Sequence, residues 1–232
     1  MRLKVGLVVP VLNNFDQAVD LIYSAKTNHE LKIYIIPQYR HQIPLAAAWN
    51  RGILSAMGDH CNVIIVSNDD VLFGPQTIND LADHTYAMGE QYAMAYPVDV
   101  LDELDDPSEI FWSMADYSHV QPKEDQTFSC FAIRPGFFDK CGTFDENFDP
   151  AWWEDTDMKY RMKLLGYKTL RTAFPYVHLR HQTTQKLNLP LNSTKSGEYY
   201  YKKWGSNRKD LTELFKTPYN NPSLSPKEWK KL

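Results

Sequence analysis

The stretch KVGLVVPVL, residues 4–12, is a continuous apolar run rich in valine. A run of β-branched residues without polar alternation is typical of a parallel strand that is buried on both faces. Pro10 interrupts the run and no small-residue cleavage site follows, so we interpret it as a first strand and not as a signal peptide. No other stretch approaches the roughly 20 apolar residues of a membrane span. We therefore expect a cytoplasmic protein that is at most peripheral at a membrane surface.

Predicted strands and helices alternate from this first strand onward. Further strands are predicted at 31–37, 62–73, 92–98, 127–134 and 167–172. Helical spacing of apolar residues predicts helices at 15–25, 44–57, 75–88, 135–142 and 153–166. This order predicts an α/β fold with an open, mostly parallel sheet and helices on both faces.

The charges are distributed unevenly along the chain, although the net charge is only −4. Residues 1–155 contain 9 Lys and Arg against 24 Asp and Glu, whereas residues 156–232 contain 16 against 5. Such asymmetry indicates an anionic partner for the basic part, with a bipolar solvated surface as the alternative. The three cysteines have no metal-type spacing, which favours reduced thiols in an intracellular protein.

A first acidic cluster, Asn68-Asp69-Asp70 in VSNDDV, is predicted as a polar turn just past the buried strand that begins at residue 62. In open α/β sheets, ligands bind outside the carboxyl ends of the strands. Adjacent carboxylates repel each other unless a cation or hydrogen-bond donors share them, and a hard divalent ion would do so. His178 and His181 follow the last predicted strand and suit the same metal site. An ordinary Asn-Asp turn is the alternative.

A second acidic cluster lies in AWWEDTDMKYRM, residues 151–162, where two tryptophans precede three acids. An indole stacks on a sugar ring while a carboxylate accepts hydrogen bonds from its hydroxyls, so the pattern predicts a base beside a sugar. The alternative is that the acids occupy the first turn of a helix, where the helix dipole favours negative charge.

Four motifs in order resemble glycosyltransferase family 2 and its relatives of GT-A fold: VVPVLNN (8–14), AAAWNRGI (46–53), VSNDDV (66–71) and the block 142–168 with a following histidine. The resemblance covers roughly residues 3–181. It implies a GT-A type, Rossmann-like fold over 1–181, with a nucleotide-sugar half at about 1–100 and an acceptor and catalytic half at about 101–181. Residues 182–232 would form a basic, aromatic extension with a Pro-rich tail.

The resemblance also implies site residues. Those that would bind the nucleotide sugar are Pro10, Val11, Asn13, Asn14, Asn50, Arg51, Asn68 and Asp69. Asp70 would be the ligand of a Mn²⁺ or Mg²⁺ ion, together with His181 or, as the alternative, His178. Asp155 would be the catalytic base and Glu154 would bind sugar hydroxyls. The residues that would shape the acceptor pocket are Trp152, Trp153 and Asp157.

The activity implied is inverting transfer of a sugar from a nucleoside-diphosphate sugar, a UDP-sugar as first expectation, to an acceptor hydroxyl. A nucleotidyltransferase is one alternative, although it would need a Gly-rich basic loop that PVLNNFDQA (10–18) does not provide. A non-catalytic sugar- or polymer-binding relative is another, because Asn68 replaces the first acid of the Asp-x-Asp motif.

Residues 196–210 interleave four aromatic residues with lysine and arginine. Basic residues with stacking aromatics suit an anionic polymer or a phospholipid surface. Our hypothesis is that residues 196–232 recognise an anionic acceptor, either a lipid-linked saccharide or a nucleic acid. The alternative is an amphipathic helix whose aromatic residues pack on the domain.

Overall fold

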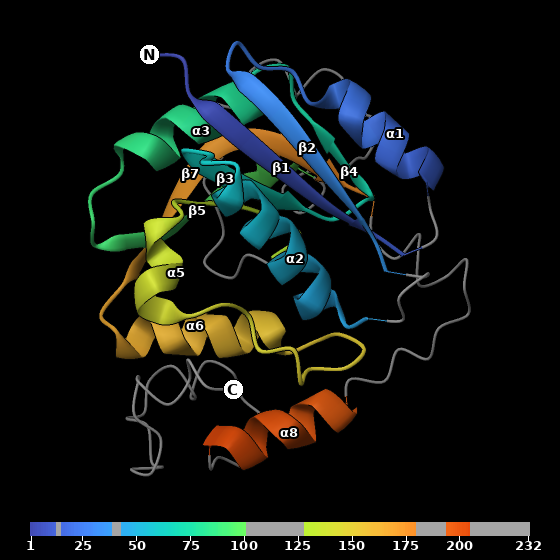
Figure 1. The fold of residues 1–232 in the computed structure, drawn as a ribbon, viewed down its shortest axis with the longest axis vertical. Helices are drawn as coiled ribbons and strands as arrows, with labels where there is room; N and C mark the ends of the chain where they lie inside the picture. The colour runs from blue at the N-terminus through green and yellow to red at the C-terminus, as the bar shows by residue number, and fades with distance from the viewer. Residues whose placement is uncertain (13–14, 39–42, 101–127, 180–193, 205–232) are drawn as a thin grey trace.

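A computed structural model describes residues 1–12, 15–38, 43–100, 128–179 and 194–204. These residues form one seven-stranded, curled sheet in the order β2-β1-β3-β6-β5-β7-β4 (Figure 1). β1, β2, β3, β5 and β7 run in one direction, and β4 and β6 run against them. The strands are β1 (Lys4–Val11), β2 (Glu30–Pro37), β3 (Val63–Ser67), β4 (Val71–Phe73), β5 (Tyr92–Asp99), β6 (Cys130–Ile133) and β7 (Lys168–His178).

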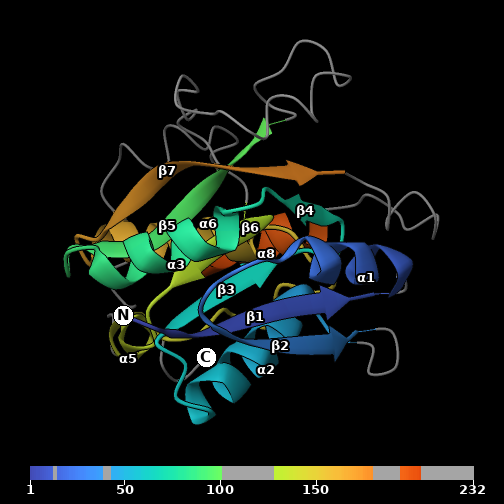
Figure 2. The ribbon, with the colours of Figure 1, turned by 90° about the horizontal axis from the view of Figure 1, so that it is seen from above.

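Helices cover both faces of the sheet. One core cluster joins the sheet to α1 and α3, and a second joins the other face to α2, α5 and α6. Figure 2 shows α1 and α2 on opposite sides of β1 and β2. The helices are α1 (Phe15–Ser24), α2 (Leu45–Gly58), α3 (Thr77–Ala87), α5 (Gly136–Cys141), α6 (Glu154–Leu164) and α8 (Thr194–Trp204).

β1 is buried on both faces, as its continuous apolar run predicts. Val5, Leu7 and Val9 belong to the core under α1 and α3, whereas Val8 belongs to the core under α2. α2 approaches β1 so closely that a Cβ on Gly52 would lie 2.2 Å from Val8 Cγ1. A side chain at this glycine would therefore separate α2 from the sheet.

The strand directions bring polar residues to one edge of the sheet. Because β4 and β6 are antiparallel to their neighbours, their first residues lie at the same edge as the last residues of the five other strands. Asp70, Asp99, Ser129 and His178 are therefore gathered at the carboxyl edge of the parallel strands. This is the edge at which open α/β sheets bind ligands.

The predicted α/β class and mostly parallel strand direction are confirmed. Two elements differ in extent from the sequence-based prediction. The segment 62–73 has the predicted strand (β3) and polar turn but also a separate second strand (β4), and the last predicted strand continues to His178. The three cysteines are buried free thiols. Among the described ranges, none of the helices is long and apolar enough to cross a membrane.

Candidate active site

The Asn68–Asp70 turn is fixed by strands on both sides. The Asn68 amide donates to Ser129 O at 2.8 Å, and the Leu179 amide donates to Asp70 O at 2.9 Å. Both Asp69 and Asp70 are only 6% exposed. Since β4 pairs with the end of β7, the turn carries its acids directly to the final residues of that strand.

Asp70 contacts a histidine at the end of β7. His178 Nε2 lies 3.1 Å from Asp70 Oδ1, and the His178 amide donates to Asp99 Oδ1 at 3.2 Å. Burial alone would lower the pKa of His178, but its hydrogen bond to Asp70 and the negative charges of Asp70, Asp99 and Asp69 raise it above the usual value. Of the two candidate histidines, His178 is thus placed at Asp70, while His181 lies outside the described residues.

Asp70 and His178 are residue types that can both bind a divalent cation. The 3.1 Å between His178 Nε2 and Asp70 Oδ1 is the length of a hydrogen bond, so a bound cation would replace this contact. Within the described ranges there is no group of three or more His, Cys, Asp and Glu residues suited to a metal ion. Two protein ligands suffice for an ion such as Mg²⁺, which takes its remaining ligands from water and substrate phosphates.

The turn that begins α6 has an unusual backbone. Trp152 and Trp153 have φ of 71° and 73°, in the left-handed region that a bulky residue rarely adopts. Trp153 is the N-cap of α6 and makes no side-chain capping hydrogen bond, while its carbonyl accepts the Asp157 amide at 2.8 Å. Such backbone strain clusters at functional sites and persists only where surrounding contacts maintain it.

Asp155 is the accessible acid of this turn. Its Oδ1 accepts hydrogen bonds from the Thr156 amide at 2.7 Å and from Thr156 Oγ1 at 3.3 Å, and its Oδ2 lies 3.7 Å from Lys159 Nζ. Its side chain is 26% exposed. These contacts fix the orientation of a carboxylate that can still be reached from solvent, as a general base requires.

Glu154 is buried, in contrast to the neighbouring Asp155. It is 4% exposed, and burial together with the charge of Asp155 raises its pKa to about 8. Its Oε2 has no hydrogen-bond partner among the described residues. At neutral pH this carboxyl is mostly protonated, so it can donate a hydrogen bond but is a poor base.

The pKa of Glu154 has a consequence for stability. An unfolded glutamate is ionised above pH about 4.3, whereas folded Glu154 holds its proton up to about pH 8, so stability falls as pH rises between these values. Glu154→Gln removes this dependence. We expect the variant to gain up to about 1.4 kcal/mol over wild type for each pH unit in that interval. Urea unfolding at pH 5.5 and pH 7.5 measures it, and an equal difference at both values would contradict the raised pKa.

The two acidic clusters are linked by the segment that begins β6. Phe128 packs against Tyr96 with centroids 5.4 Å apart, and Lys159 Nζ lies 5.2 Å from the Phe128 ring. The carbonyl of the neighbouring Ser129 accepts the Asn68 amide, and burial together with the negative charge of Asp155 raises the pKa of Tyr96. The start of α6 therefore borders the same carboxyl edge of the sheet as the Asp70 turn.

Other residues proposed to bind the nucleotide sugar have mixed placements. Pro10 and Val11 are buried at the carboxyl end of β1, and Arg51 is exposed on α2. Asn13 and Asn14 lie outside the described residues.

Asn50, which was predicted to bind the nucleotide sugar, is buried and hydrogen-bonded to other parts of the protein. It is 2% exposed, and its Nδ2 donates to Phe144 O and to Glu146 Oε1, both at 2.8 Å. Its Oδ1 accepts the Phe144 amide at 2.9 Å. These hydrogen bonds attach α2 to residues 142–148. Both polar atoms of the Asn50 side chain therefore have protein partners.

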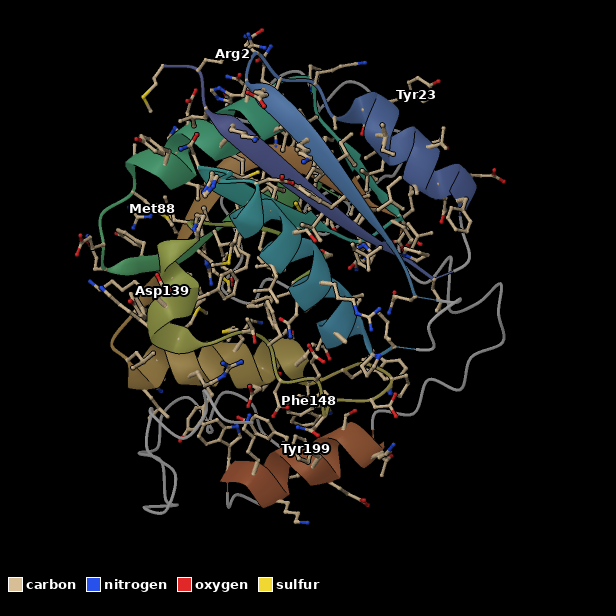
Figure 3. The ribbon with its side chains drawn as sticks, viewed as in Figure 1. Arg2, Tyr23, Met88, Asp139, Phe148 and Tyr199 are labelled. Atoms are coloured by element: carbon tan, nitrogen blue, oxygen red, sulfur yellow. The ribbon has the colours of Figure 1, made fainter. Side chains whose placement is uncertain are left out.

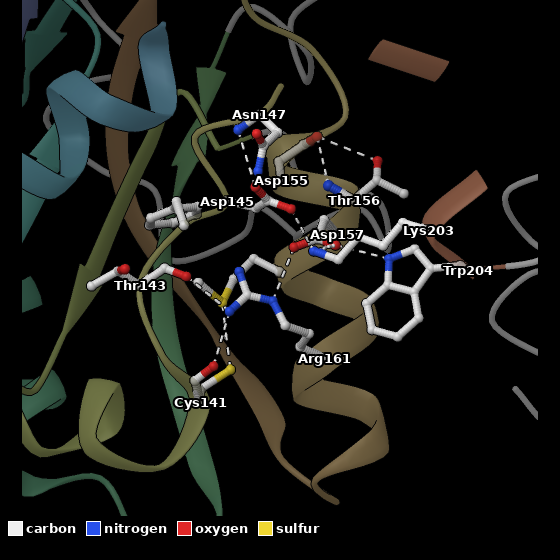
Figure 4. Close-up of polar contacts among 12 residues, drawn as sticks. Cys141, Thr143, Asp145, Asn147, Asp155, Thr156, Asp157, Arg161, Lys203 and Trp204 are labelled. Carbon is white, nitrogen blue, oxygen red and sulfur yellow. Dashed lines mark hydrogen bonds and ion pairs between the residues drawn. The ribbon is translucent and has the colours of Figure 1, made fainter. Parts of the chain in front are cut away.

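Asp157, which was predicted to shape the acceptor pocket, is buried among protein partners. It is fully buried, with Oδ2 at 2.9 Å from Arg161 Nε and Oδ1 at 2.7 Å from Lys203 Nζ. Trp204 Nε1 also donates to Oδ1 at 2.8 Å. Figure 4 shows Arg161, Lys203 and Trp204 converging on this carboxylate. The two buried cations compensate for the cost of removing this carboxylate from water.

Trp153 packs on α8 and so contributes to the protein core. Its ring lies 5.2 Å from Tyr200 and 5.5 Å from Tyr201, measured between centroids. Trp152, which is partly exposed, remains the better candidate for an acceptor surface.

For α8, the alternative of an amphipathic helix packed on the domain is confirmed. Tyr200 and Trp204 are buried against Phe148 and Tyr160, and Figure 3 shows Phe148 facing α8 near Tyr199. Lys203 is also buried in ion pairs, so it is not a surface cation. Nothing in the sequence signals the site contacts made by Asp99, Thr156 and Lys159, or the ion pairs of Lys203. For α8, the i, i+4 spacing of Tyr200 and Trp204 is typical of a helix that packs on a core.

Solved structures of glycosyltransferases are similar in fold to this chain. No protein-family model matches the chain, and no curated protein matches it in sequence. A solved structure of a mutant of Drosophila β1,4-galactosyltransferase 7, in complex with manganese, UDP-Gal and xylobiose, matches with a TM-score of 0.57 and 14% identity over 90% of this chain and 83% of that one. The catalytic domain of the same enzyme with xylobiose gives 0.55 and 12% over 97% and 83%. GalNAc-T7 with UDP, GalNAc and Mn²⁺ gives 0.54 and 15% over 99% and 53%.

The chain has the GT-A glycosyltransferase fold. The GT-A fold that the resemblance implied is confirmed, whereas membership of family 2 stays a prediction. Identities of 12–15% show the fold alone, so the activity has to be argued from the site.

Proposed function

We propose that the protein is a glycosyltransferase of the family 2 type that transfers a sugar from a nucleoside-diphosphate sugar to an acceptor hydroxyl. The observation that carries the proposal is the pairing of two sites at one edge of the sheet. One site, Asp70 with His178, suits a cation bound to phosphate, and the other presents the accessible carboxylate of Asp155. In this proposal, the bond between the sugar and the diphosphate lies between the cation and the base.

Asp70 and His178 would hold a Mn²⁺ or Mg²⁺ ion that neutralises the charge developing on the departing diphosphate. Asp69 lies next to them and Asn68 at the entrance of the turn, where an amide can donate to a phosphate or ribose oxygen. The neighbours crystallised with UDP and manganese support a UDP-sugar as the first donor to test.

Asp155 takes the proton of the acceptor hydroxyl as that oxygen bonds to the anomeric carbon. The bond between the anomeric carbon and the diphosphate oxygen breaks, and its electron pair leaves with the nucleoside diphosphate. Attack from the opposite face inverts the anomeric configuration with a single base. Glu154, as a neutral carboxyl, donates to a sugar oxygen, and the partly exposed Trp152 provides an apolar face for the acceptor ring.

The acceptor is a hydroxyl compound, and xylobiose in a structural neighbour supports a saccharide as the first choice. Lys203 does not support an anionic acceptor, because its ammonium group is buried in ion pairs with Asp145 and Asp157. The hypothesis of an anionic acceptor now depends on Lys202, which is exposed on α8, and on basic residues outside the described part of the chain.

Metal-dependent nucleotide binding tests the first site directly. By calorimetry, we expect UDP or another nucleoside diphosphate to bind wild type with Mn²⁺ and at least about 10-fold more weakly without it. Asp70→Ala and His178→Ala should each remove most of the Mn²⁺ dependence, because each deletes one of two protein ligands.

The control is Asp139→Asn, on α5 away from the carboxyl edge (Figure 3), which should bind as wild type does. Nucleotide affinity that is indifferent to Mn²⁺, in wild type and both variants, would show that Asp70 and His178 hold no such ion.

A further inference from the structure

Helix α8 holds the start of the helical turn that carries Glu154 and Asp155. The Trp153 ring lies over Gly197 so closely that a Cβ there would be 3.2 Å from the indole. The same ring packs on Tyr200 at 5.2 Å between centroids. Trp153 is the residue directly before the two acids, so its ring is fixed by a helix distant in sequence.

The same helix holds the end of that turn. Lys203 Nζ lies 2.7 Å from Asp157 Oδ1 and 2.7 Å from Asp145 Oδ2, and Trp204 Nε1 donates to Asp157 Oδ1 at 2.8 Å (Figure 4). Asp157 also closes the turn through its backbone, because its amide donates to Trp153 O at 2.8 Å. Both ends of the turn are therefore bound to α8, and the acids lie between them.

Local sequence does little to fix this turn. Trp152 and Trp153 have positive φ without being glycine, and the N-cap makes no side-chain hydrogen bond. A helix start of this kind lacks the usual capping stabilisation, so tertiary contacts must hold its conformation. These tertiary contacts come from α8. Arg161 adds one within α6, because it binds the other carboxylate oxygen of Asp157.

We propose that α8 is a positioning element of the active site, in which Lys203 and Trp204 act through Asp157 to set the orientation of Asp155. The inference rests on the proposed function and extends it to a segment beyond the catalytic motifs. A displacement of a catalytic group by about 1 Å lowers turnover by up to about 100-fold, while substrate that binds elsewhere in the site is held as before. Loss of the α8 contacts thus lowers kcat and leaves the donor KM nearly unchanged.

Lys203→Met tests the proposal, because methionine keeps the length of the side chain and removes its charge. We expect kcat for transfer to fall by about 10-fold or more, with the donor KM within about 2-fold of wild type. Trp204→Phe, a milder variant that removes the indole N–H, should show a smaller fall of the same kind. Lys203→Arg should recover part of the activity. All rates are measured at a temperature where unfolding curves show each variant folded.

A matched control separates positioning from stability. Leu81→Ala removes a fully buried side chain of α3, which packs on the face of the sheet opposite α6, and should lower Tm while leaving kcat near that of wild type. Normal turnover in both Lys203→Met and Trp204→Phe, or an equal fall in kcat in Leu81→Ala, would overturn the proposal.

Hydrogen exchange at the Asp157 amide distinguishes failure of this inference from failure of the proposed function. If wild type transfers no sugar, the proposed function fails, but the effect of α8 on the turn is still measured. Faster exchange of that amide in Lys203→Met and Trp204→Phe, and not in Leu81→Ala, supports the role of α8 in fixing the turn. Unchanged exchange in both α8 variants contradicts it.

Discussion

Asp155→Asn lowers glycosyl transfer by about 10²-fold or more, while the affinity for the nucleotide-sugar donor stays close to that of wild type. The carboxamide keeps the shape of the side chain and its hydrogen bonds from Thr156. It cannot take the proton of the acceptor hydroxyl, and loss of a general base typically costs 10²–10⁴-fold in rate. Steady-state transfer kinetics and calorimetric titration with the donor measure the two effects separately.

The control for this variant is Asp149→Asn, which changes an exposed acid of the same loop that forms an ion pair with Lys195 at the surface. It should transfer at close to the wild-type rate. Turnover of Asp155→Asn within a few-fold of wild type, with Glu154 intact, would show that Asp155 is not the general base. Glu154 would then be the next acid to test in that role.

Asp157→Ala destabilises the fold by about 3–5 kcal/mol, the usual cost of removing one partner from a buried ion pair. The substitution leaves Arg161 and Lys203 without the carboxylate that lies between them, and Trp204 Nε1 loses its acceptor. Urea unfolding of both proteins gives the free energy of unfolding.

Asp149→Ala is the comparison, since its ion pair is exposed and should cost no more than about 1 kcal/mol. A loss of similar size in both variants would contradict a structural role for Asp157 and restore it as a candidate for acceptor binding.

The fold could be predicted from sequence because its elements have strong local patterns. The valine-rich run of β1 and the alanine-rich α2 are determined by hydrophobic periodicity. The turn after β3 and the acids of α6 were recognisable for a similar reason, because carboxylates beside a buried strand or beside indoles are costly without a function or a partner.

The roles of Asn50 and Asp157 could not be predicted, because they depend on partners distant in sequence. Asn50 binds the backbone of Phe144, and Asp157 binds Lys203 on a helix that follows β7. A polar side chain in a motif looks the same in sequence whether it faces substrate or is buried with a cation. The distinction between Glu154 and Asp155 could not be predicted either, because the sequence does not show that Glu154 is buried and Asp155 partly exposed.

Release of nucleoside diphosphate from a panel of sugar nucleotides tests the central claim most directly. Wild-type protein is incubated with each donor, Mn²⁺ and a saccharide acceptor, beside Asp70→Ala and Asp155→Asn. We expect wild type to release nucleoside diphosphate from at least one donor, with a new glycosidic bond of inverted configuration visible by NMR, and both variants to be slower by about 10²-fold. Donor binding by wild type without release or transfer would indicate a non-catalytic sugar-binding relative. If no sugar nucleotide is bound or cleaved, the assignment as a glycosyltransferase is wrong.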